Sequence, residues 1–180
     1  QQKFANLFFH IKTRKIKIPA KGVIEQKNAF QLALNRYFNG DIVSEKTFDW
    51  MTTPTNVNEY PYLVSALKKY RGMSDFNRAG YKLRCDFVCE SKKLIFEYDE
   101  RQHFSLARKV ALESYMDFIP LYFDKQSWID TCQSIQAKDD DPINRDEVRA
   151  YYDSIRDIQS ARNGYKLIRI MHGAYDWNKL

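Results

Sequence analysis

Acidic residues cluster in one stretch of the chain in a pattern that could bind a cation. The sequence KLIFEYD contains Glu97 and Asp99 two positions apart, and Asp86 precedes them in the sequence LRCDF. If KLIFEYD is a β-strand, Glu97 and Asp99 share a face, because successive side chains alternate between the two faces. Carboxylate oxygens are the ligands that a hard divalent cation such as magnesium prefers. These residues are therefore candidates for a magnesium site.

The carboxylates lie in a segment, residues 81–99, in which aromatic, β-branched and aliphatic residues alternate with charged ones. This composition predicts a β-hairpin. With a two-residue turn in its middle, Asp86 lies opposite Glu97, and Arg84 lies opposite Asp99. Directly paired residues project to the same face of a sheet. We therefore expect three carboxylates and an arginine to crowd one patch.

The predicted turn of this hairpin is formed by Ser91 and Lys92, and the first strand is expected to present one buried apolar row. The row consists of Leu83, Cys85, Phe87 and Cys89. Four strand residues span about 13 Å, which is too far for a disulfide between the two cysteines. We expect both cysteines to be buried reduced thiols.

Like charges that face each other destabilise a sheet and raise carboxylate pKa values, so the acidic patch needs a compensating cation. Arg84 could neutralise one carboxylate, and a divalent cation could neutralise the other two. The alternative interpretation is a solvated strand face with an ordinary cross-strand ion pair, because charged alternation is common on exposed sheets.

The string LRCDFVCESKKLIFEYDERQHFS, residues 83–105, resembles the core of the PD-(D/E)XK nucleases, in particular the very-short-patch-repair-like branch. In that branch a strand with Asp-Phe is followed by a strand with Glu-x-Asp and then by Gln-His. A weaker similarity lies in a helix with an Arg-Asp pair that runs into GYKLIRI, residues 164–170. The matching residues are Asp86, Phe87, Glu97, Asp99, Gln102, His103, Arg156 and Asp157.

The resemblance implies a restriction-endonuclease-like α/β fold and metal-dependent hydrolysis of phosphodiester bonds in DNA. By this resemblance, Asp86 and Glu97 would hold magnesium or manganese, and Asp99 occupies the place where the wider superfamily has lysine. His103 would lie near the scissile phosphate, where its ordinary pKa near 6.5 suits proton transfer. Glu25 is a speculative further acidic residue, because related folds often point a helix glutamate at the site.

The charge balance of the chain favours a polyanionic partner. It has 29 Lys and Arg against 23 Asp and Glu, a formal net charge of +6, and basic residues supply most of the affinity of proteins for nucleic acid. The candidate DNA contacts are Arg84, Arg101, Gln102 and Arg156.

Helices and further strands must position these residues, and their pattern predicts a mixed sheet of four or five strands with the hairpin at its centre and helices around it. We expect helices at 22–38, 59–70, 105–116, 126–137 and 146–162 and strands at 41–50 and 165–171. The 180 residues suit a single nuclease domain. Residues 119–142 are interpreted as an insertion within it.

The sequence has no run of roughly 18–20 apolar residues and no secretory signal at its start, which predicts a cytoplasmic protein with no membrane partner. We expect a prokaryotic or phage origin; in a eukaryote, a nuclear location is the alternative. Cutting both strands of DNA would require a homodimer or sequential nicking. Two alternatives to a DNA endonuclease remain: a catalytically silent nucleic-acid-binding module of the same fold, and an RNA-directed nuclease.

Overall fold

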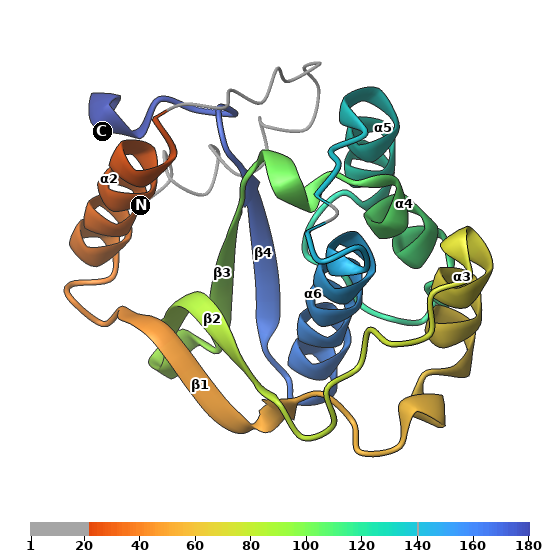
Figure 1. The fold of residues 1–180 in the computed structure, drawn as a ribbon. Helices are drawn as coiled ribbons and strands as arrows, with labels where there is room; N and C mark the ends of the chain where they lie inside the picture. The colour runs from red at the N-terminus through yellow and green to blue at the C-terminus, as the bar shows by residue number, and fades with distance from the viewer. Residues whose placement is uncertain (1–21, 140) are drawn as a thin grey trace.

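A mixed four-stranded sheet lies at the centre of the computed structural model, which describes residues 22–139 and 141–180. The strands lie in the order β1, β2, β3, β4 (Figure 1). The first three pair antiparallel, and β4 pairs parallel to β3. The strand bounds are Val43–Thr52, Lys82–Cys89, Leu94–Asp99 and Lys166–Met171. The predicted α/β class and the central position of the hairpin are confirmed.

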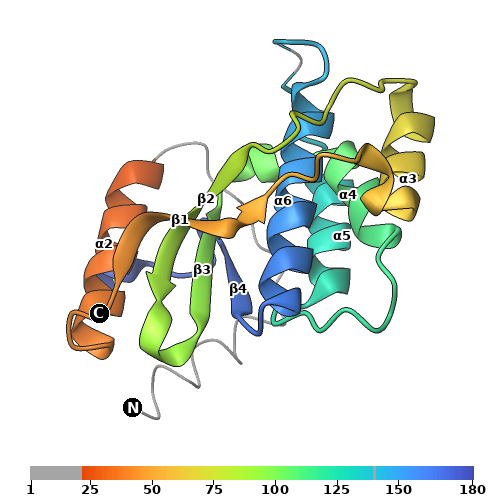
Figure 2. The same ribbon diagram turned by 90° about the horizontal axis from the view of Figure 1, so that it is seen from below.

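Helices cover both faces of the sheet. One face packs against α2 and the other against α6, beyond which lie α3, α4 and α5 (Figures 1 and 2). The helices α2 to α6 span Val23–Tyr37, Pro61–Arg71, Leu106–Glu113, Lys125–Ile135 and Arg145–Arg162. Each matches a predicted helix to within a few residues. None of the described helices is long and apolar enough to cross a membrane.

Because both faces are covered, the apolar residues of β2 divide between two clusters. Leu83 and Cys85 pack on the α6 face, whereas Phe87 packs against Phe30 of α2, with ring centroids 5.7 Å apart. The expectation of one apolar row on β2 is therefore wrong. A strand buried on both faces must carry apolar side chains on both, and strict alternation does not describe it.

The alternation along β2 changes at Asp86. The register of β1 against β2 puts Glu45 opposite Asp86, between the pairs Ser44–Phe87 and Lys46–Cys85. Glu45 has a φ of 53°, in the left-handed region that non-glycine residues rarely adopt. The strand pair is thus distorted at the position of the candidate metal ligand.

The predicted register of β2 against β3 is confirmed. The observed pairs run from Cys89–Leu94 to Phe87–Phe96, in the register that brings Asp86 beside Glu97. The turn is longer than expected, because Glu90–Lys92 form a 3-10 turn and Lys93 then adopts a φ of 51°.

The segment interpreted as an insertion carries α5. Trp128 and Cys132 of this helix are buried in a separate apolar cluster with Phe104 and Leu112. This cluster closes the end of the sheet near the C-terminus of β3, where the candidate site lies.

Candidate active site

The strands β2 and β3 separate beyond the pair Phe87–Phe96. There, two carboxylates accept hydrogen bonds from backbone N–H groups of the opposite strand. Asp86 Oδ2 accepts from the backbone N–H of Tyr98 at 2.8 Å. In return, Glu97 Oε1 accepts from the backbone N–H of Asp86 at 3.2 Å. Each carboxylate is thereby held by the backbone of the opposite strand, and Asp86 and Glu97 become neighbours as the sequence predicted.

Glu97 is the buried member of this pair, with 5% of its surface exposed. Its nearest cation is Arg156, whose Nε lies 3.6 Å from Oε2. Burial raises the pKa of the Glu97 carboxyl to about 8; Arg156 opposes this rise, and the charge of Asp86 adds to it. At neutral pH this carboxyl therefore holds a proton unless a further cation approaches.

Lys27 of α2 supplies a cation to the other carboxylate. Its Nζ lies 2.7 Å from Asp86 Oδ1. Burial alone would lower the pKa of Lys27, but the charge and the hydrogen bond of Asp86 outweigh burial and raise it. Lys27 thus stays charged across the ordinary pH range, and it cannot act as a general base.

Asp99 is not part of this pair. Its carboxylate is 1% exposed, accepts from Arg169 Nη1 at 2.7 Å and accepts from Trp128 Nε1 at 2.7 Å. The predicted pairing of Arg84 with Asp99 is wrong, because the diverging strands carry Arg84 toward β1, where it faces Thr47. The single patch of three carboxylates and an arginine does not form.

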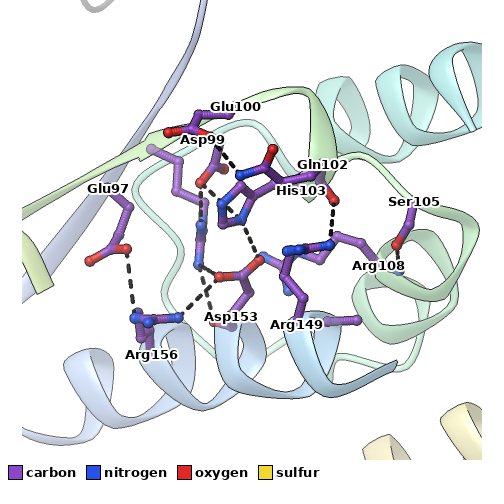
Figure 3. Close-up of polar contacts among 12 residues, drawn as sticks. Glu97, Asp99, Glu100, Gln102, His103, Ser105, Arg108, Arg149, Asp153 and Arg156 are labelled. Carbon is purple, nitrogen blue, oxygen red and sulfur yellow. Dashed lines mark hydrogen bonds and ion pairs between the residues drawn. The ribbon is translucent and has the colours of Figure 1, made fainter. Parts of the chain in front are cut away.

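His103 lies on the 3-10 turn Arg101–His103 that follows β3, and it pairs with a buried carboxylate of α6 (Figure 3). Its Nδ1 lies 2.8 Å from Asp153 Oδ2 and 3.8 Å from Asp99 Oδ1. Burial would lower the pKa of His103, but Asp153 and then Asp99 raise it above its ordinary value. The pKa of Asp153 is held well below its usual range, because His103 and Arg169 outweigh its burial. His103 is therefore better suited to donate a proton than to accept one.

Arg156 connects the two parts of the site. It donates from Nε to the backbone carbonyl of Arg84 at 2.8 Å, and its Nη1 lies 3.2 Å from Asp153 Oδ1 (Figure 3). Together with its 3.6 Å contact to Glu97, these contacts link β2, β3 and α6. The guanidinium thus has internal partners, whereas the sequence predicts a DNA contact for it.

A fully buried ionic network connects the elements that carry the residues of the candidate site. Asp157 of α6 accepts from Arg169 Nε at 2.8 Å and from Arg108 Nη2 at 2.7 Å. Tyr115 donates its hydroxyl to the same carboxylate at 2.7 Å. The network joins α4, α6 and β4, and Arg169 extends it to Asp99.

The other predicted contact residues lie at the surface. Arg84 has 70% of its side chain exposed and reaches Glu45 at 3.4 Å. Arg101 and Gln102 are exposed and line a shallow hollow with Lys138. Glu25 accepts from Asn178 at 2.9 Å. The acidic residue expected from the first helix therefore faces the C-terminal turn and not Asp86.

Sequence reasoning missed Lys27, Asp153, Arg108 and Arg169. A signal existed for Lys27, because it lies three residues before the buried Phe30 on the helix face that meets the sheet. Asp153 likewise lies three residues after the buried Ala150 of α6, but nothing in the sequence indicates that its partner is His103.

The donor set around Asp86 and Glu97 is small. Within residues 22–139 and 141–180, no group of three or more His, Cys, Asp and Glu side chains is arranged to hold a metal ion. Magnesium usually binds to one or two carboxylates, waters and substrate phosphates, so two adjacent carboxylates still suit it.

Comparisons with known proteins give no relative from which a function could be transferred: no protein-family model, curated protein or solved structure matches the chain.

Proposed function

We propose that this protein is a divalent-metal-dependent endonuclease that hydrolyses phosphodiester bonds in DNA, with a restriction-endonuclease-like fold. The observation that carries the proposal is the convergence of Asp86 and Glu97 where β2 and β3 separate. The similarity of residues 83–105 to very-short-patch-repair-like nucleases gives the same two residues as metal ligands. The observed sheet, with helices on both faces, is compatible with that assignment.

The chemistry of the donors suits magnesium or manganese. Both ligands are carboxylates, and burial raises the pKa of Glu97, so that a bound cation would be needed to hold this carboxylate in its charged form. Bound metal would lower the pKa of a water molecule and offset the charge of the phosphate. Arg156 and Lys27 add fixed positive charge on either side of the carboxylates, where an anionic phosphate would enter.

In this proposal His103 donates a proton to the leaving oxygen. Its Nδ1 is bound to Asp153, which leaves Nε2 for the substrate. Asp153 and Asp99 raise the pKa of the ring, which favours the protonated form that a general acid needs. Asp153 is then a positioning residue that orients the ring and stabilises its charge.

A second candidate function is the silent nucleic-acid-binding module. It is favoured by the ion pair between Lys27 and Asp86, which already neutralises one proposed ligand. Asp99, at the place of the superfamily lysine, is likewise neutralised by Arg169. A site whose charges are satisfied internally needs no metal, and the net charge of +6 would still attract nucleic acid.

Cleavage assays distinguish the two candidates. Wild type, Asp86→Ala and Glu97→Ala are incubated with plasmid and short duplex DNA and matched RNA, in magnesium, manganese or EDTA. The matched control is Asp49→Ala, which removes an exposed carboxylate from the neighbouring strand. We expect metal-dependent DNA cleavage that both site variants reduce by at least about 100-fold, because each removes one of the two ligands.

Cleavage that persists in EDTA, or that equals wild type in both site variants, would contradict the proposal. Tight DNA binding without cleavage in any metal would favour the silent module. Cleavage of RNA but not of DNA would support the same metal site with RNA as its substrate.

A further inference from the structure

A stack of three side chains lies beside the candidate site, and none of the three has a role in the proposed cleavage. The rings of Tyr81 and Tyr152 are stacked, with centroids 5.6 Å apart and planes inclined by 26°. The guanidinium carbon of Arg78 lies 5.0 Å from the centroid of Tyr81. Tyr81 is 40% exposed.

The stack is joined to the candidate site along two elements. Tyr152 directly precedes Asp153 in α6 and lies one turn, about 6 Å, from Arg156. Tyr81 directly precedes β2 and lies five positions, about 16 Å along the strand, from Asp86. The connection from α3 to β2, which carries Arg78, runs beside α6 (Figure 2).

Contacts other than those of the Tyr81 ring also hold this connection. Backbone groups anchor it to the end of β1: the N–H of Thr53 donates to the carbonyl of Tyr81 at 3.0 Å, and that of Gly80 donates to the carbonyl of Thr53 at 3.1 Å. The Thr53 hydroxyl accepts from the N–H of Tyr81 at 2.9 Å and donates to the carbonyl of Arg78. The connection is thus anchored by groups other than the Tyr81 ring, which remains partly exposed.

We propose that Arg78, Tyr81 and Tyr152 form a stacking platform for unpaired bases of single-stranded DNA. Exposed aromatic rings stack on nucleobases of any sequence, and an arginine beside them adds cation–π attraction and binds phosphate. Bases inside a duplex have both faces covered by their neighbours, so only an unpaired base can use the platform. The inference rests on the proposed function, because it assigns the substrate class of that site.

The platform predicts where the substrate must be open. Its separation from Asp86 corresponds to a few nucleotides, so the strand to be cut is single-stranded, frayed or mispaired within that distance of the scissile phosphate. A fully paired duplex would reach the carboxylates without contacting Tyr81.

Binding measured in EDTA tests the platform without cleavage. Wild type, Tyr81→Ala and Tyr81→Phe are titrated into a fluorescent single-stranded oligonucleotide, the same oligonucleotide with abasic sites, and a blunt duplex. The matched control is Tyr122→Ala, because Tyr122 is 45% exposed and also lies under a cation, with Lys166 Nζ 5.4 Å from its ring centroid. Near-UV circular dichroism and thermal unfolding verify that each variant is folded.

We expect Tyr81→Ala to weaken binding of the single strand by roughly 5- to 150-fold, the loss of one stacked base. Tyr81→Phe and Tyr122→Ala should bind like wild type, and the effect of Tyr81→Ala should disappear on the abasic strand. Equal effects on normal and abasic strands, or no effect at all, would overturn the platform. Because the assay needs no metal, loss of the nuclease proposal alone would leave this result unchanged.

Discussion

At the scale of single residues, the buried carboxyl of Glu97 sets the expected dependence of stability on pH. Its pKa rises from an ordinary value of 4.5 to about 8 on folding. Between these values the folded protein keeps a proton that the unfolded chain releases. The free energy of unfolding contributed by Glu97 is therefore fully present below pH 4.5 and falls as the pH rises to 8, by at most about 5 kcal/mol.

Glu97→Gln, which cannot ionise, should flatten this part of the profile. Urea unfolding of both proteins at intervals from pH 5 to pH 9 measures the difference, and comparison with wild type cancels the titration of other groups. The control is Glu113→Gln, an exposed carboxyl on α4. Parallel profiles for wild type and Glu97→Gln would mean that Glu97 is ionised in the folded protein.

Lys27 has a role that only a substitution can assign. Lys27→Met keeps most of the length of the side chain but removes the charge beside Asp86. If Lys27 stabilises charge on the substrate, cleavage at saturating magnesium should fall roughly 10- to 100-fold, and Lys27→Arg should retain most of it. Because the ammonium also competes for Asp86, the same Met variant should bind magnesium more tightly, as isothermal titration calorimetry would record.

The control for Lys27 is Lys109→Met, which removes a lysine paired with Glu113 on α4. Undiminished cleavage by Lys27→Met, with tighter magnesium binding, would show that the lysine acts only as a competitor for the site.

At the scale of elements, Asp157 holds α4, α6 and β4 together through Arg108 and Arg169. Asp157→Asn would leave two buried guanidiniums short of negative charge, and breaking a buried pair typically costs about 3–5 kcal/mol. Urea unfolding should record a loss of this size. Asp49→Asn removes an exposed ion pair and should change stability by less than about 1 kcal/mol. An equally small loss for Asp157→Asn would show that the network does not hold these elements together.

The central hairpin is the element that sequence reasoning described best. Its register is fixed by pairing close to the turn, which is a local property, even though the turn itself is longer than expected. Beyond Phe87 the strands diverge to meet different neighbours, β1 for Arg84 and β4 for Asp99. The predicted pairing of Arg84 with Asp99 is wrong because it treated β2 and β3 as a pair of strands without other neighbours.

At the scale of the whole molecule, the functional groups come from both faces of the sheet. Lys27 reaches Asp86 from α2, whereas Arg156 and Asp153 approach from α6 on the other face (Figures 1 and 3). Lys27 and Arg156 thus contact Asp86 and Glu97, respectively, where β2 and β3 separate. The dimer, the cytoplasmic location and the preference for DNA over RNA also concern the whole molecule. They stay predictions.

The sequence by itself determined the α/β class, the helix positions, the hairpin and the adjacency of Asp86 and Glu97. These follow from periodicity and from short-range pairing, which act over a few residues. Only the tertiary structure decided the ionic partners. Lys27 and Asp86 are 59 positions apart, and His103 and Asp153 are 50 apart. Such pairs depend on how whole elements pack, which no local pattern of residue types specifies.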